Sequence, residues 1–249
     1  MSKLVYVCLL LIFCLETSAN EKKFSTAGYF QVNNTGRTVN SFNPGWKFLK
    51  GDMEMPVALN YNDSDWQVVN LPHGIENLPE EASGCINYQG VVWYRKKFDG
   101  QKLAKGKKHF LHFEAIMGKS EIYVNGKLLK EQFGGYLPAI IDVTSAINYE
   151  GGNVVAVKAD NTNDPVVPPG KKQEVLDFTY FGGIYRDCWL ISHNNVHLTD
   201  ANYENVVAGG GLVISSSEVS DASAKLNVKF HLRNELKVGF KGKVELILQ

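Results

Sequence analysis

Hydrophobic and polar residues alternate in short runs along this chain of 249 residues, and no long segment repeats its apolar positions with a helical period. Alternation with a period of two is typical of strands that bury one face. Four such runs are rich in β-branched and aromatic residues: residues 91–98, 109–114, 153–159 and 184–191. The pattern predicts an all-β chain.

A hairpin gives the clearest local signal, in residues 121–130, where Asn125-Gly126 separates two apolar runs. This dipeptide favours a two-residue turn that needs positive φ at both positions. Because further strand signals recur at short intervals, the whole pattern predicts a β-sandwich or jelly roll. Residues 160–178 interrupt it with three prolines and predict a long ordered loop, a kind of segment that often carries function.

A change of pattern near residues 197–204 indicates a domain boundary. Beyond it, about three strands are predicted at residues 208–217, 225–233 and 243–248. An immunoglobulin-like sandwich needs about seven strands. The last run reaches the end of the chain with its apolar face uncovered, so we expect a truncated domain. The predicted domains are a first sandwich at residues 20–200 and a partial immunoglobulin-like domain at residues 201–249.

Residues 1–19 have the pattern of a secretory signal peptide. Lys3 supplies the positive start, and residues 4–15 form an apolar run too short to span a bilayer. Small residues precede the predicted cleavage after Ala19. A membrane anchor is one alternative, and lipoprotein processing at Cys14 is another, although the bulky Phe13 disfavours it. We therefore expect export to the periplasm or the exterior of a bacterium.

Charge and cysteine content exclude some functions. Lys+Arg and Asp+Glu both number 26, so no global basic field attracts nucleic acid. Removal of the signal peptide leaves Cys85 and Cys188, which either form one bridge or remain two free thiols. Their spacing is not that of a metal site. No metal, cofactor or nucleic-acid partner is assigned.

Seven segments resemble, in order, the N-terminal sugar-binding domain of glycoside hydrolase family 2, with the nearest likeness to its β-galactosidase-like members. They include Trp-x-x-Val-x-Leu-Pro-His at residues 66–73 and Trp-Tyr-Arg-Lys-Lys-Phe at residues 93–98. The full set is residues 42–48, 65–73, 93–98, 113–126, 135–142, 153–161 and 182–187.

The resemblance implies a galactose-binding-like jelly roll, followed by an immunoglobulin-like domain, in a secreted retaining exo-glycosidase that cleaves terminal β-glycosidic bonds of carbohydrate. Such enzymes use two carboxylates about 5–5.5 Å apart, one as acid/base and one as nucleophile. The family carries both in a (β/α)8 barrel beyond these domains. Alternating strands without helices do not build such a barrel. No catalytic residue is therefore assigned, and the chain alone is expected to be inactive without the missing domains.

The resemblance also gives Asp177 a role, because the family places an aspartate at this spacing before residues 178–186 that reaches into the active site. A carboxylate there accepts charge-assisted hydrogen bonds from sugar hydroxyls. The alternative is a loop aspartate that caps a turn. Asn161 is a second candidate for sugar contact, with ordinary turn chemistry as its alternative.

Tryptophan side chains bear on a competing function, a stand-alone lectin-like module without hydrolase activity. Each tryptophan lies in or beside a predicted strand, where this residue is usually part of the core. The four are Trp46, Trp66, Trp93 and Trp189. Exposed tryptophans on one sheet face would favour the lectin-like module, whereas Asp177 on an open rim would favour the glycosidase.

Overall fold

The computed structural model describes residues 36–246 except 55, 79–86 and 208. These residues fall in one compact unit. The predicted signal peptide and Cys85 lie outside the described residues. The boundary predicted at residue 200 falls inside the compact unit and stays a prediction.

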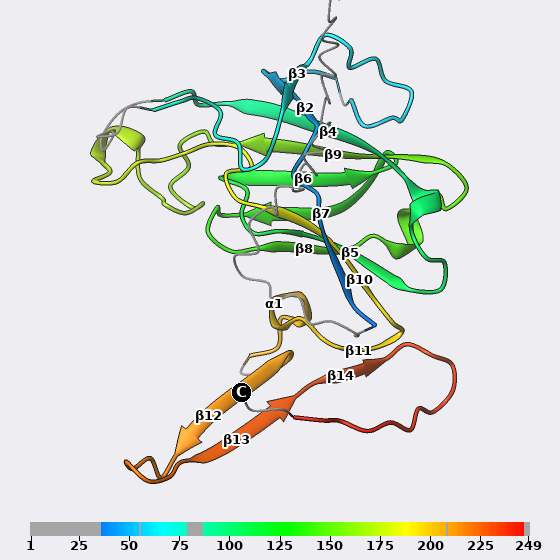
Figure 1. Ribbon diagram of the computed structural model, residues 1–249. Coiled ribbons are helices and arrows are strands. Elements are labelled where there is room, and N and C mark those ends of the chain that lie inside the picture. The colour runs from blue at the N-terminus through cyan, green and yellow to red at the C-terminus, as the bar shows by residue number, and fades with distance from the viewer. Residues whose placement is uncertain (1–35, 55, 79–86, 208, 247–249) are drawn as a thin grey trace, which may run out of the picture. The chain divides into compact units, whose positions relative to one another are not determined.

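The larger sheet of the fold has six antiparallel strands in the order β3-β2-β4-β9-β6-β7 (Figure 1). In that order they are Gln67–Val69, Trp46–Lys50, Val91–Asp99, Gly152–Asp160, Lys119–Val124 and Lys127–Phe133. The predicted hairpin is confirmed between β6 and β7, where Asn125 and Gly126 have φ values of 51° and 84°. A left-handed conformation at both positions is what this turn requires.

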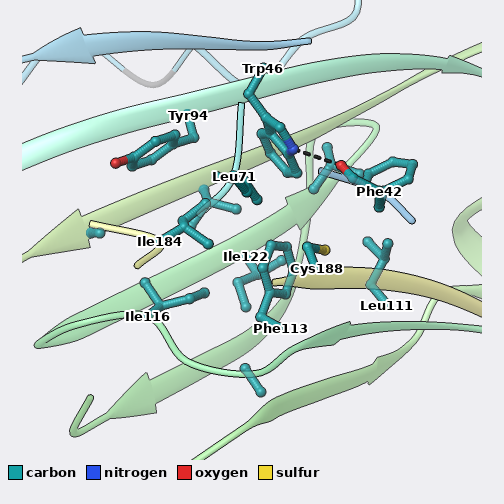
Figure 2. Packing of buried hydrophobic residues seen from close by; sticks show 14 of the residues in the cluster. Phe42, Trp46, Leu71, Tyr94, Leu111, Phe113, Ile116, Ile122, Ile184 and Cys188 are labelled. Carbon is teal, nitrogen blue, oxygen red and sulfur yellow. Dashed lines mark hydrogen bonds between the residues drawn. The ribbon is translucent and has the colours of Figure 1, made fainter. Parts of the chain in front are cut away.

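The second sheet has four antiparallel strands in the order β1-β10-β5-β8. They are Thr38–Ser41, Cys188–His193, Lys108–Phe113 and Ala139–Asp142. Apolar side chains of the two sheets meet in one core that includes Trp46, Tyr94 and Phe113 (Figure 2). Trp46 donates its indole N–H to the carbonyl of Phe42 at 2.8 Å, which satisfies the polar atom of a fully buried side chain. The all-β sandwich predicted from the sequence is confirmed.

The strand predicted at residues 184–191 is wrong in its first half, because β10 begins at Cys188. The backbone before it bonds to other segments instead. Ile184 accepts from His73 N–H at 2.8 Å, and Asp187 accepts from Glu114 N–H at 2.9 Å. Side-chain alternation alone does not reveal this exchange of partners.

The chain beyond β10 forms two short strand pairs and one helical turn. The elements are β11 (Val196–Leu198), α1 (Ala201–Glu204), β12 (Leu212–Ser217), β13 (Lys225–Phe230) and β14 (Leu232–Asn234). β11 pairs with β14, and β12 with β13. The strand predicted at residues 243–248 is wrong over residues 243–246, which have no strand structure. An alternating run forms a strand only where a neighbour accepts its hydrogen bonds.

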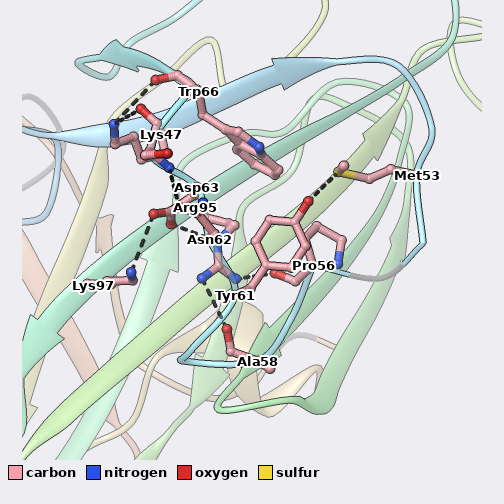
Figure 3. Close-up of polar contacts among 11 residues, drawn as sticks. Lys47, Met53, Pro56, Ala58, Tyr61, Asn62, Asp63, Trp66, Arg95 and Lys97 are labelled. Atoms are coloured by element: carbon pink, nitrogen blue, oxygen red, sulfur yellow. Dashed lines mark hydrogen bonds and ion pairs between the residues drawn. The ribbon is translucent and has the colours of Figure 1, made fainter.

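A buried arginine fixes the loop between β2 and β3 on the outer face of β4 (Figure 3). Arg95 donates from Nε to Asp63 Oδ2 at 2.9 Å, and its other nitrogens donate to the carbonyls of Pro56 and Ala58. The Arg95 side chain is 0% exposed and that of Asp63 is 10% exposed. Burial alone would raise the pKa of Asp63, but the bonds and charges of Arg95 and Lys97 outweigh it and lower that pKa. The pair thus belongs to the fold.

Candidate functional site

Residues 161–187 join β9 to β10 and include most of the long loop predicted at residues 160–178. In Figure 1 this segment, drawn in yellow-green, extends beyond the ends of β4 and β9. It contains one short 3-10 helix, η3, at Gln173–Val175. The loop therefore occupies one end of the sandwich.

Asn161 anchors the start of this loop. Its side-chain Oδ1 accepts from Gly90 N–H at 2.9 Å, and its Nδ2 donates to the Tyr88 carbonyl at 2.7 Å. The residue is 1% exposed. Through these bonds Asn161 holds the start of the loop against residues 88–90. Its contact with sugar stays a prediction.

A glycine pair anchors the far end of the loop. The carbonyl of Gly182 accepts from Ile75 N–H at 3.2 Å, and that of Gly183 accepts from Met117 N–H at 2.9 Å. A Cβ at Gly182 would lie 2.5 Å from Asn161 Nδ2, and Gly183 has a φ of +87°. Because this approach leaves no room for side chains, the glycines lock the loop against two neighbouring segments.

Two buried side chains hold the middle of the loop. Leu176 and Tyr180 pack with Met117 in a small apolar cluster. Burial raises the pKa of the Tyr180 hydroxyl to about 12, so it is protonated at neutral pH. The backbone between these two anchors is thereby fixed, although its own side chains face outward.

Asp177 lies directly between the two anchors and is exposed. Within the described part of the chain, no hydrogen bond or ion pair is made by its carboxylate. By contrast, Asp164 earlier in the loop pairs with Lys119 at 2.6 Å and accepts from Val166 N–H at 2.8 Å. The loop thus contains one aspartate that caps a turn and another, Asp177, that is presented to the surroundings.

Aromatic and aliphatic side chains surround Asp177 along the chain. Phe178 is 43% exposed, and Val175 and Phe181 are also exposed. A carboxylate among apolar surfaces suits a pyranose, whose hydroxyls need acceptors and whose C–H faces stack on rings. The arrangement can bind a polar ring.

Asn87 and Gln173 are site residues that the sequence did not point to. Asn87 N–H donates to Gln173 Oε1 at 3.0 Å, and Asn87 Nδ2 donates to the carbonyl of Tyr180. Among the described residues, Asn87 Oδ1 and Gln173 Nε2 are buried and have no hydrogen-bond partner. Unpaired buried atoms of this kind are uncommon and often mark a place where a ligand or water binds. The two residues are 86 positions apart, so no local sequence pattern predicts their contact.

The described residues contain no group of three or more His, Cys, Asp or Glu side chains that could hold a metal ion. No helix in the described part of the chain is long and apolar enough to cross a bilayer.

The comparison with protein families decides the assignment of this fold and loop. Residues 53–194 match the family described as "Glycosyl hydrolases family 2, sugar binding domain". The chain belongs to glycoside hydrolase family 2. Its match runs from the β2–β3 loop to the end of β10, so it includes Asn161, Asp177 and the glycine pair.

Relatives of this family 2 chain have two kinds of name. A β-galactosidase of Thermoanaerobacter pseudethanolicus is 35% identical over 68% of the chain, and a β-glucuronidase of Formosa agariphila is 31% identical over 82% of it. In both cases the chain spans 22% of the relative. It corresponds to the N-terminal region of such β-glycosidases, which is consistent with the non-catalytic part expected from the sequence.

Solved structures give the same result. A Bacteroides uniformis β-glucuronidase superposes with a TM-score of 0.67 at 30% identity, covering 80% of this chain and 22% of that one. Another family 2 β-glucuronidase superposes with a TM-score of 0.69 at 29% identity over 83% of this chain and 23% of that one.

Proposed function

We propose that this chain is the N-terminal, non-catalytic part of an exported, retaining exo-β-glycosidase, and that Asp177 contacts the sugar at the edge of a catalytic barrel. The barrel lies outside the chain and supplies the two carboxylates of such enzymes. The observation that carries the proposal is the exposed carboxylate of Asp177, which has no partner among the described residues, on a backbone fixed by Leu176 and Tyr180. A rigid backbone positions a ligand-binding group more precisely than a free loop does.

The substrate class follows from the same surroundings and from the relatives. A carboxylate that accepts from hydroxyl groups suits a hexose or a hexuronic acid at the non-reducing end of a glycan. The names β-galactosidase and β-glucuronidase among the relatives agree with these two classes. The proposed reaction is hydrolysis of a terminal β-linked sugar.

The lectin-like alternative receives no support from the tryptophans. Each of the four is buried, with exposed fractions of 0% for Trp46 and Trp93, 6% for Trp66 and 3% for Trp189. None presents a ring face to a sugar. The exposure of Asp177 supports the glycosidase.

Two measurements test the proposal. In the complete enzyme, Asp177→Asn should lower kcat/KM for an aryl β-glycoside by about 10- to 100-fold, the loss of one charge-assisted hydrogen bond of about 1.5–3 kcal/mol, and leave Tm unchanged. Glu174→Gln is the matched control, because Glu174 is an exposed acid in the same loop and should change neither quantity. Equal effects of both replacements, or a large fall in Tm for Asp177→Asn, would contradict the sugar contact.

The second measurement concerns the chain alone. It should not hydrolyse aryl β-galactosides or aryl β-glucuronides, because the proposed enzyme carries its two-carboxylate pair in the barrel. Turnover by the purified chain that Asp177→Asn abolishes would show that catalysis resides here and would refute the non-catalytic assignment.

A further inference from the structure

Histidines gather at one place on the outer face of the four-stranded sheet. His112 on β5, His193 on β10 and His197 on β11 line a cavity of about 220 Å³. His231 bonds through Nδ1 to Thr199 Oγ1, a residue of the same lining, at 3.0 Å. Three of the six histidines of the chain thus line this cavity, and a fourth, His231, contacts a residue of its lining.

The rings in this cavity pack on one another. His193 stacks on His197 with ring centroids 5.0 Å apart and an interplanar angle of 24°. Phe110 contacts His193 edge-on at 5.5 Å and Tyr203 of α1 at 5.1 Å. The stack is therefore part of the apolar contact between the sheet and the segment that follows it.

The charged groups around the rings are largely committed to other partners. Asp200 accepts from the N–H groups of Asn202 and Tyr203 at 2.8 and 3.1 Å, and Glu204 pairs with Arg233. Arg37, from the segment before β1, also lines the cavity. Because these polar atoms already serve the fold, the cavity has the character of a packed junction rather than of a ligand cleft.

Hydrogen bonds at this junction join residues 195–199 to residues 231–235, and an ion pair attaches the latter to the sheet. Thr199 N–H donates to the His231 carbonyl at 3.0 Å, and Glu235 N–H donates to the Asn195 carbonyl at 2.9 Å. Lys108 of β5 bridges Asp142 at 2.5 Å and Glu235 at 2.8 Å. These contacts lie beside the histidine stack and depend on the same placement of residues 195–204.

Protonation works against this packing. Two imidazolium rings stacked at 5.0 Å repel each other, and the positive charge of Arg37 in the same cavity adds to the repulsion. Burial lowers the pKa of His112 to about 4, although Asp200 partly opposes the shift. Burial, followed by the charges of His197 and Arg37, lowers the pKa of His193 to about 4.

We propose that this histidine junction is an acid-labile hinge, in which protonation of His193 and His112 displaces residues 195–204 from the sheet and thereby breaks the pairing of β11 with β14, while the sandwich stays folded. Ordinary histidine has a pKa of about 6.5. Between pH about 6.5 and 4 the released form binds more protons than the packed form, so release is favoured as the pH falls. Each additional proton multiplies the release equilibrium by up to about tenfold per pH unit.

Hydrogen–deuterium exchange on the full chain at pH 7.5 and pH 5.0, corrected for the intrinsic pH dependence of exchange, tests the hinge. Protection of residues 196–199 and 231–235 should fall at least tenfold at pH 5.0 relative to that of β4 and β9. The double replacement His112→Gln/His193→Gln should abolish this difference. His73→Asn, at the other end of the sandwich, is the control and should retain it.

Two outcomes would overturn the proposal: unchanged protection of the junction at pH 5.0 in the native sequence, or the same loss in the double variant. If the double variant fails to fold, His197→Phe keeps the stacked ring and removes one charge. A shift of the release midpoint to lower pH then supports the hinge, and an unmoved midpoint refutes it.

Discussion

Two long loops of this sandwich each carry an aspartate, and the two carboxylates have opposite surroundings. In the β2–β3 loop, Asp63 is nearly buried against Arg95, which is itself buried and bonded to two carbonyls (Figure 3). In the β9–β10 loop, Asp177 is exposed between the buried Leu176 and Tyr180. The difference shows how a fold separates a carboxylate that holds structure from one that is kept available to a ligand.

Removing the arginine should have the largest effect on this contrast. Arg95→Met leaves the Asp63 carboxylate without its buried partner and frees the β2–β3 loop, so we expect a loss of about 3–5 kcal/mol in the free energy of unfolding. Urea denaturation measures it. Lys97→Met is the control, because the Lys97 side chain is 51% exposed and its pair with Asp63 should contribute below about 1 kcal/mol. Equal losses would mean that the loop does not depend on Arg95.

Replacing Asn161 should have an intermediate effect on the free energy of unfolding. Asn161→Ala removes one acceptor and one donor from buried backbone groups at the start of the β9–β10 loop, which should cost about 1–3 kcal/mol. The matched control, Asn163→Ala, lies two residues away in a less buried position and should cost less than about 0.5 kcal/mol. Thermal unfolding of the two variants compares them. A stable Asn161→Ala protein would refute the structural role.

The contrast between the two aspartates is tested most directly by replacing each of them with alanine and comparing the free energies of unfolding. Asp177→Ala should change the free energy of unfolding by less than about 0.5 kcal/mol, because no described contact is lost. Asp63→Ala should be clearly destabilising, because it leaves the buried positive charge of Arg95 without its carboxylate partner. If Asp177→Ala proves as destabilising as Asp63→Ala, Asp177 is a capping residue.

Acid should have the smallest and most gradual of these effects. It should reduce the stability that the ionised Asp63 carboxylate contributes. Because its pKa is lowered in the fold, its stabilising effect is present above the ordinary aspartate pKa of about 4 and is lost as the pH falls below that value. The stability gap between the native protein and Asp63→Asn should therefore narrow between pH 5 and pH 3 in urea titrations. A constant gap would show that Arg95 does not shift the pKa of Asp63.

The sequence predicted the features that depend on neighbouring residues. Alternation located β4, β5 and β9, and Asn125-Gly126 located the hairpin, because strand faces and tight turns are set by adjacent side chains. It did not predict that residues 184–187 leave the strand, because their backbone partners lie elsewhere in the chain.

Partners distant in sequence account for the parts of the site that were missed. Asn87 meets Gln173 across 86 positions, and Arg95 reaches Asp63 across 32. Asp177 became a candidate site residue through the family resemblance, and its contact with sugar stays a prediction. Its exposure followed from packing of Leu176 and Tyr180, which no local pattern specifies.

The buried thiol of Cys188 allows opening of the sandwich core to be measured. Cys188 is free, lies in the core between the sheets and is 0% exposed, and burial raises the pKa of its thiol further. A thiol in this state reacts with an alkylating reagent only when β10 separates from its neighbours. With the other three cysteines replaced by serine, the rate of Cys188 labelling would therefore give the opening free energy of the core in native buffer, without denaturant and without an added probe.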